Sequence, residues 1–392
     1  MRLRASFSLF LLLASAGGSG AAPFTPSSDA EVLERLPFAR RDPVMREIEG
    51  LQAQLKRDPN DLRVAARLAR TYLQLSRSTS DPRYVGYAQA ALAPWWNEAH
   101  PPFDVLLLRA TARQRVHQFD AALADLDAAI AIDPRSAQAH LTRATVLQVT
   151  GAYAPARDSC ARIAGPSLRL VRAACLANAT GAVGRLRDSY DLLKEELAQN
   201  ADAAPAIRAF VATALGEMAE RLGDAAAAEE HFRAALSLEP NDPYLLGAFS
   251  DLLLDAGRPE EVETLLKGKE RIDPLLLRLA LAARHSGAAT LDERVAQLRE
   301  RFAASRLRGD TAHRREEARF ALHLQNEPER ALILARENWR VQKEPADLRI
   351  LLQSAAAARD ADALREARAF LEETKLEDAR LKQFISIAAH PN

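Results

Sequence analysis

The chain has 392 residues, of which 48% are hydrophobic, 27% charged and only 6% aromatic. This composition is too apolar for a disordered chain, and fibrous classes are excluded as well. The 53 basic side chains balance the 53 acidic ones, so the formal net charge is zero. No global field therefore attracts nucleic acid or an anionic membrane, and electrostatic recognition must come from a local patch.

The N-terminus has the order of a secretory signal peptide. Two arginines within the first four residues precede an apolar stretch through Leu13, and small residues follow. We expect a signal peptide over 1–21, cleaved after Ala21 rather than Ala16, and a linker over 22–42. An uncleaved anchor is the alternative, but this run is too short to cross a hydrocarbon core about 30 Å thick. The sequence predicts export without membrane insertion after cleavage.

Two later segments share one spacing of small and large residues. In each, a small residue is followed four positions later by a large one, then three later by alanine and five later by proline. Antiparallel helices approach closely only where both present Gly or Ala, while a bulky residue fills the adjacent gap. Proline then ends the second helix. The residues are Ala122, Leu126, Ala129 and Pro134 in the first segment and Ala228, Phe232, Ala235 and Pro240 in the second.

This pattern closely resembles the second half of a tetratricopeptide repeat (TPR). Leu215 and Gly216 also stand where the family places a Leu-Gly pair, eight residues before Gly223. The resemblance implies an all-α protein, a right-handed α-solenoid of antiparallel helix pairs. Prolines that would end successive units recur mostly 32 to 39 residues apart, at Pro59, Pro134, Pro166, Pro205, Pro240 and Pro274.

The array is expected over residues 43–375, clearest over 60–260 and degenerate after 275, with a C-terminal capping helix and tail over 376–392. Residues 80–96 resemble a stretch found in a group of exported bacterial TPR proteins, which narrows the lineage without supplying a function. The charged run Arg314–Glu317 is interpreted as a solvated helical face.

Residues 76–96 depart from the repeat rule. Tyr72 and Ala88 are 16 residues apart where the pattern requires nine, so about seven residues are inserted between two helices. Aromatic and arginine clusters are typical of binding hot spots. The alternative is that the aromatic side chains pack the inserted loop and cover the end of the core. The candidate residues are Arg83, Tyr84, Tyr87, Trp95 and Trp96.

The resemblance also implies a concave groove lined by the first helix of each unit. In this register the groove is polar, with a basic N-terminal end that partly resembles the carboxylate clamp of peptide-binding TPR domains. A solvated helix face explains the same arginines equally well. The candidate groove residues are Arg63, Arg67, Arg70, Gln114, Arg115, Gln138, Thr145, Gln148 and Asn178.

Cys160 and Cys175 are the only two cysteines. The repeat register places them on neighbouring helices, the second helix of one unit and the first helix of the next. In an oxidising compartment we expect a disulfide, which would contribute about 3 kcal/mol for a loop of this length. Two buried free thiols are the alternative. A metal site is not expected, because no histidine or acidic cluster lies at ligand spacing.

No motif supplies a nucleophile, an acid–base pair, a cofactor loop or a metal set, so we expect no enzyme and no cofactor. The function predicted is a protein- or peptide-binding scaffold in the periplasm of a Gram-negative bacterium. The alternative is a glycan or small-ligand binding protein that uses the aromatic insertion at 76–96.

Overall fold

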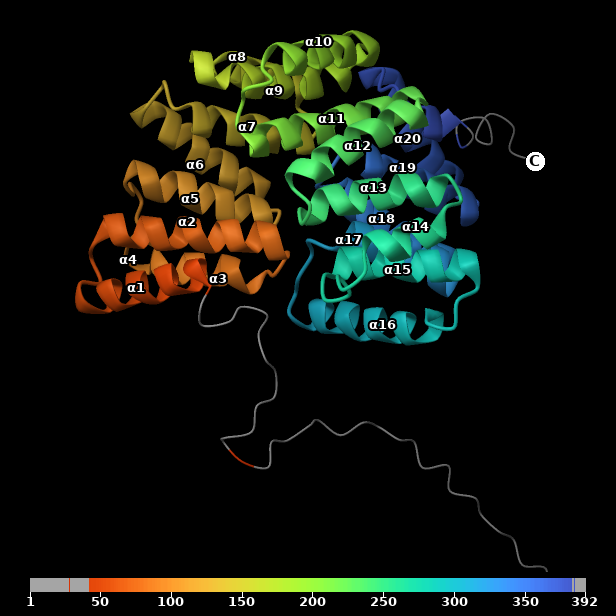
Figure 1. Cartoon of the computed structure of the whole chain (residues 1–392), viewed down its shortest axis with the longest axis horizontal. Helices are drawn as coiled ribbons and strands as arrows, with labels where there is room; N and C mark the ends of the chain where they lie inside the picture. The colour runs from red at the N-terminus through yellow and green to blue at the C-terminus, as the bar shows by residue number, and fades with distance from the viewer. Residues whose placement is uncertain (1–27, 29–41, 383, 385–392) are drawn as a thin grey trace, which may run out of the picture. The chain divides into compact units, whose positions relative to one another are not determined.

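The computed structural model describes residues 42–382, together with Ser28 and Phe384 (Figure 1). These residues form twenty α-helices, two 3-10 turns and one π-helical turn, with no strand among them. The predicted signal peptide, nearly all of the predicted linker and the end of the predicted C-terminal cap lie outside them. Two compact units are distinguished, residues 1–47 and 48–392. The array belongs to the second unit from Ile48 onward.

The first half of the array begins with a helix whose start lies in the first unit and continues with helix pairs. Its elements are α1 (Pro43–Arg57), α2 (Leu62–Thr79), α3 (Arg83–Ala91), α4 (Ala93–Trp96), α5 (Phe103–Arg115), α6 (Phe119–Ile132), α7 (Ala137–Val149), α8 (Tyr153–Ala161), η1 (Pro166–Leu168), α9 (Arg169–Gly181) and α10 (Leu186–Gln199).

The second half continues with α11 (Pro205–Leu222), α12 (Ala225–Leu238), α13 (Pro243–Asp255), α14 (Pro259–Leu265), α15 (Asp273–Ser286), α16 (Leu291–Leu307), α17 (Arg314–Phe320), η2 (Ala321–Gln325), α18 (Pro328–Trp339), α19 (Pro345–Ala357), α20 (Ala361–Thr374) and η3 (Ala379–Leu381). Consecutive helices form antiparallel pairs, for example α5 with α6 and α11 with α12. The predicted all-α solenoid of TPR-type helix pairs is confirmed.

The repeat residues pack as their spacing predicts. Ala122, Ala228 and the large residues that follow them are fully buried. Gly216 faces the ring of Phe232, and a Cβ there would lie 2.6 Å from Cε1 of that ring. The Leu-Gly pair therefore allows the aromatic ring to lie against the backbone of α11. Gly223 then ends α11 in the left-handed region, and the Asp224 side chain caps α12 by accepting from the Ala227 amide.

The insertion at 76–96 is helical, so the expected inserted loop is wrong. The extra residues lengthen α2 to Thr79, and only Ser80–Pro82 separate α2 from α3, which the short helix α4 follows. Ser80 adopts a left-handed conformation, and the hydroxyl of Thr79 accepts from the Asp81 amide. Helix α2 continues through Leu73–Thr79. The turn forms next to Thr79, whose side chain hydrogen-bonds the backbone.

Candidate functional site

The first helices of successive units lie side by side and carry the candidate groove residues. Helix α2 contacts α5, α5 contacts α7, α7 contacts α9, α9 contacts α11 and α11 contacts α13. The arginines of α2 and Gln138 are exposed, whereas the remaining candidates are half-buried. The structure thus places all nine candidates on α2, α5, α7 and α9, but only some of them can reach a partner.

The exposed face of α2 is a row of arginines. Arg63, Arg67 and Arg70 follow each other four and three residues apart, which places them on one side of a helix whose other side is core. At the end of this face, Arg77 binds the Asp242 carboxylate with an Nη2–Oδ2 distance of 3.1 Å. Arg70 lies 3.8 Å from the Asp104 carboxylate, and both side chains are more than half exposed. We call Arg63, Arg67 and Arg70 the α2 arginine row.

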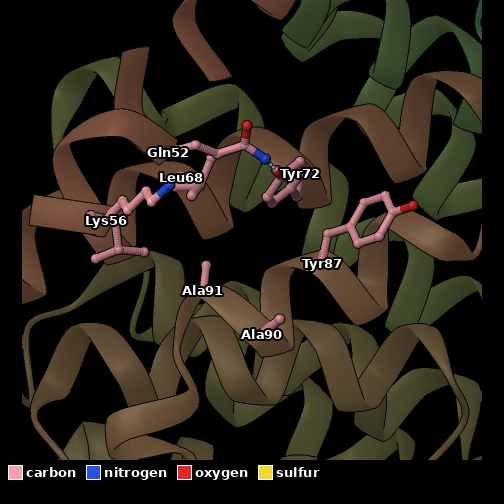
Figure 2. Close-up of a pocket in the computed structure, with 8 residues that line it drawn as sticks. Gln52, Lys56, Leu68, Tyr72, Tyr87, Ala90 and Ala91 are labelled. Atoms are coloured by element: carbon pink, nitrogen blue, oxygen red, sulfur yellow. Dashed lines mark hydrogen bonds between the residues drawn. The ribbon is translucent and has the colours of Figure 1, made fainter. Parts of the chain in front are cut away.

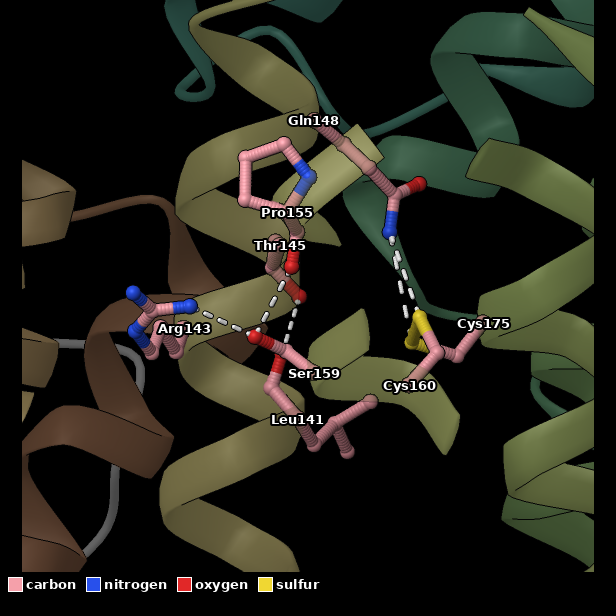
Figure 3. The surroundings of a disulfide bond; sticks show 8 residues. All are labelled: Leu141, Arg143, Thr145, Gln148, Pro155, Ser159, Cys160 and Cys175. Atoms are coloured by element: carbon pink, nitrogen blue, oxygen red, sulfur yellow. Dashed lines mark hydrogen bonds between the residues drawn. A yellow bond between two sulfur atoms is a disulfide. The ribbon is translucent and has the colours of Figure 1, made fainter. Parts of the chain in front are cut away.

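Two candidates on α7 are turned to internal partners. The Thr145 hydroxyl donates to the Leu141 carbonyl within its own helix, at 3.0 Å. The Gln148 amide lies 4.0 Å from both cysteine sulfurs and points at them (Figure 3). Gln148 therefore contacts the disulfide and does not lie open along the groove.

The predicted disulfide is confirmed. Cys160 on α8 and Cys175 on α9 have their sulfur atoms 1.93 Å apart and their Cα atoms 5.6 Å apart, and both are buried (Figure 3). The bond joins two successive helix pairs, as the repeat register indicates. Two free thiols, the alternative, are excluded for this structure.

The later part of the same surface is acidic and is covered by the chain itself. Residues 314–382, which we call the C-terminal block, bring arginines onto the carboxylates of α11 and α13. Arg319 makes two hydrogen bonds to Asp251, at 2.7 and 3.1 Å. Arg349 likewise binds Asp255, at 2.6 and 2.7 Å. Arg380 completes the set through an ion pair of 2.8 Å with Glu220.

The C-terminal block also contacts the turns between the two helices of earlier units. The Lys343 amide donates to the Val149 carbonyl at 2.7 Å, and the Tyr153 hydroxyl donates to the Lys343 carbonyl at 3.1 Å. The Leu186 amide donates to the Glu377 carboxylate at 2.8 Å. The surface formed by the first helices is therefore exposed at α2 and covered by the C-terminal block at α9–α13.

The interpretation of Arg314–Glu317 as a solvated face is wrong. Glu316 and Glu317 are 7% and 5% exposed. Glu317 binds Arg306 and also Arg330, the latter at 2.8 Å. Burial alone would raise the pKa of Glu316, but Arg315 and Arg278 hold that pKa at about 2. Sequence reasoning missed these contacts because, apart from Arg315, the partners lie on other helices.

Glu217 lies on α11 and accepts a hydrogen bond from the Tyr244 hydroxyl. Burial is the main cause that raises its pKa to about 7, and the nearby Glu344 adds to the shift against the opposing effects of Arg380 and Arg221. For Asp251 burial acts in the same sense, but Arg278 and Arg319 hold its pKa well below the usual range. On the covered surface, Glu217 is thus less strongly stabilised as a carboxylate than Asp251.

The aromatic residues of the insertion divide into two groups. Tyr72, Tyr84 and Tyr87 form a cluster with ring centroids 5.5 to 6.1 Å apart. Tyr87 is 50% exposed and lies at a shallow hollow beside Gln52, whose amide donates to the Tyr72 hydroxyl at 2.7 Å (Figure 2). The other residues that line this hollow are Leu55, Lys56, Leu68, Ala90 and Ala91.

The two tryptophans do not join that cluster's hollow. Trp96 lines a second hollow with Gly86 and Gln89, and its carbonyl accepts from Arg109. Trp95 is half-buried. Arg83 binds Asp81 at 2.6 Å. Of the five candidates, Tyr87 lines the first hollow and Trp96 the second, and Ala90 lines both hollows.

Within the part of the chain that the structure describes, no group of three or more His, Cys, Asp or Glu side chains could hold a metal ion. Over the same residues, none of the helices combines the length and the apolar character that a membrane crossing requires.

A tetratricopeptide repeat family model matches residues 219–274. No curated protein matches the chain. Among solved structures, the Cut9–Hcn1 hetero-tetramer of the APC/C is similar at 14% identity and a TM-score of 0.38, over 79% of this chain and 52% of that one. This chain thus spans about half the length of that protein.

A tetratricopeptide repeat protein from Parabacteroides merdae is similar at 13% identity, over 79% of this chain and 92% of that chain, with a TM-score of 0.27. Human IFIT1, as a dimer with m7Gppp-AAAA, is similar at 14% identity, over 88% and 86%, with a TM-score of 0.44. These likenesses concern the fold alone. Residues 219–274, which contain α12, α13 and α14, are a tetratricopeptide repeat segment, and the helix pairs around them form a solenoid of the same type.

Proposed function

We propose that this protein is a non-enzymatic scaffold of the bacterial cell envelope that binds a protein or peptide partner on the exposed part of its concave surface. The observation that carries the proposal is the α2 arginine row. Its members are exposed on a helix whose opposite face is buried, while the equivalent surface of α11 and α13 is covered by the C-terminal block.

The chemistry of the row indicates an acidic partner. Guanidinium groups bind carboxylates through two parallel hydrogen bonds, and the C-terminal block shows this geometry in Arg349 with Asp255. The arginines project from α2, whose backbone is already ordered by its packing in the array. Binding of a partner therefore costs little backbone conformational entropy on this side of the interface. The partner that fits best is an extended segment whose Asp or Glu side chains are as far apart in space as the guanidinium groups of the row.

The cell-envelope setting rests on the signal peptide predicted over residues 1–21 and on the disulfide. A bond of this kind is expected in an oxidising compartment and is rare in the bacterial cytosol. Fractionation of cells that express the full chain tests the setting. Periplasmic protein with blocked thiols is expected, and cytoplasmic protein with two reactive thiols would contradict it.

The binding surface is tested by photo-crosslinking in cells. A crosslinking amino acid replaces Gln74, which is exposed on α2 beside the arginine row, and in a control it replaces Glu300, which is exposed on α16. A discrete adduct from position 74 that is absent from position 300 is expected. Equal labelling from both positions would reject the α2 surface as the site.

The tyrosine cluster supports a second candidate function, the binding of a glycan. Tyr87 is half exposed, and Gln52 and Lys56 supply a hydrogen-bonding amide and a cation beside its hollow. Aromatic faces of this kind pack against the apolar faces of sugars. Thermal unfolding with cell-wall fragments separates the two candidates, since only glycan binding predicts a direct rise in Tm that the Tyr87→Ala variant loses.

A further inference from the structure

The segment that follows α20 lies against earlier turns of the array and ends in the 3-10 turn η3. Helix α20 ends at Thr374, and the residue that caps it, Lys375, is in the left-handed region. The Glu377 carboxylate accepts from the Leu186 amide at 2.8 Å, across 191 residues of sequence. The Glu377 carbonyl accepts from Arg221 Nε at 3.1 Å. Side chain and main chain of one residue are thus both bound by the array.

A glycine in each of two turns lets this segment approach the backbone of the array closely. A Cβ at Gly184, in the turn between α9 and α10, would lie 2.8 Å from the Cβ of Lys375. At Gly223, in the turn between α11 and α12, it would lie 3.2 Å from the Cβ of Ala379. Both glycines have positive φ, so another residue would be strained there as well.

Side chains of the segment fill the remaining space. Leu376 and Leu381 are 7% and 1% exposed, in a cluster that includes Ala182 and Leu348. Arg380 pairs with Glu220 of α11 at 2.8 Å. The array therefore recognises the segment through the segment's own glutamate, arginine and two leucines, as well as through its main chain.

The groups that receive the segment are positioned by the array itself. Arg221 also donates from Nη2 to the Gly181 carbonyl at 2.8 Å, which fixes its guanidinium independently of Glu377. The segment in turn holds its own shape, because the Asp378 carboxylate accepts from the amide and from Nε of Arg380 at 3.0 and 2.9 Å. A preorganised receptor and a preshaped short ligand are the features of a peptide-binding site.

We propose that the turns α9–α10 and α11–α12 form a peptide-binding site which residues Lys375–Leu381 occupy, and that a partner protein with a segment of the same chemistry exchanges with them. The partner segment carries a leucine and a glutamate followed by an aspartate, an arginine and a second leucine. The site is separate from the α2 arginine row, so the two proposals fail or succeed independently.

The test uses the full chain and a fluorescent peptide with the sequence of residues 374–382. In the chain, Leu376→Ala with Leu381→Ala weakens the resident segment but leaves Leu186, Gly184 and Arg221 unchanged. Fluorescence anisotropy should show the peptide binding this variant at least tenfold more tightly than the wild type. Circular dichroism checks that the variant keeps its helical content, and a scrambled peptide is the ligand control.

A double-mutant cycle tests the assigned contact. A peptide with glutamine in place of Arg380 should bind the double-alanine chain more weakly, and the difference should disappear when that chain also carries Glu220→Gln. Failure of the peptide to bind a helical double-alanine chain overturns the proposal, as does equal binding to that chain and the wild type. A variant that dimerises by size exclusion overturns it in favour of exchange of the segment between two copies.

If the double-alanine chain unfolds, the same site can be tested in the wild-type chain by hydrogen exchange. Excess unlabelled peptide should then increase hydrogen exchange in residues 375–382, because the resident segment is displaced. Unchanged exchange at saturating peptide overturns the proposal.

Discussion

Two sets of arginine–carboxylate pairs hold different parts of this molecule. In the early array, Arg109 and Asp125 join α5 to α6 across 16 residues, and both side chains are less than a tenth exposed. In the C-terminal block, Arg349 reaches Asp255 across 94 residues, and both side chains are between a fifth and two fifths exposed. The first set is part of one helix pair, whereas the second fastens one region onto another. The same chemistry therefore joins two helices of one pair in the early array and fastens the C-terminal block onto α13 in the later part.

The largest effect is expected when the buried local pair is broken. Asp125→Ala leaves Arg109 buried without its carboxylate, and Arg113, 2.7 Å from the same group, loses its carboxylate partner too. We expect a loss of about 3–5 kcal/mol in the free energy of unfolding. Urea unfolding followed by circular dichroism measures it. A loss below about 1 kcal/mol, typical of exposed pairs, would erase the distinction between the two sets.

Loss of the disulfide should cost somewhat less. Cys160→Ser with Cys175→Ser removes a link that closes a 15-residue separation, for which chain entropy gives about 3 kcal/mol. The unfolding midpoint in urea, with and without reductant, measures it. Reductant should lower the midpoint of the wild type and leave the double variant unchanged. A wild type insensitive to complete reduction would contradict the predicted contribution.

The free energy of unfolding that Glu217 contributes on the covered surface should decrease as pH rises. The pKa of Glu217 is about 7 in the folded chain and near 4.5 when unfolded, so between these values the unfolded state releases its proton first. The contribution of this residue to stability is complete below pH 4.5 and falls until about pH 7, by about 1–2 kcal/mol after allowance for solvent contact. Glu217→Gln should reduce the slope of unfolding free energy between pH 5 and 7. An unchanged slope would contradict the assignment.

The smallest effect on stability is expected at the long-range pair. Arg349→Ala removes two hydrogen bonds to a partly exposed carboxylate, and the loss should be about 0.2–1 kcal/mol. Hydrogen exchange should nevertheless increase in α19 while it stays unchanged in α5 and α6. Equal increases in both regions would show that the pair supports the whole array and not the closure alone.

The fold could be predicted from the sequence because its determinants are local. The spacing from Ala122 to Pro134 lies within one helix and its turn, and Gly216 and Phe232 belong to one helix pair. The disulfide followed from the same register. The insertion was misjudged, because the repeat rule shows that residues are added but not that α2 itself continues to Thr79.

The closure of the surface could not be predicted. Its contacts join residues 68 to 191 positions apart, and arginines such as Arg319 and Arg349 have the helical spacing of a solvated face. Nothing in one sequence distinguishes such a face from one that another region covers. The structure places the three arginines of the α2 arginine row on one exposed face of α2, and their role in binding stays a prediction.

The most direct test of a divided concave surface compares three double charge reversals in capture of the crosslinked partner. Arg63→Glu with Arg70→Glu changes the exposed row, Arg319→Glu with Arg349→Glu changes the covered part, and Arg299→Glu with Arg308→Glu makes the same charge change on and just after α16. We predict at least a tenfold loss of capture for the first variant and no loss for the other two, with helical content unchanged in the first and third. Capture that survives in the first variant, or falls equally in the first and third, would contradict this account.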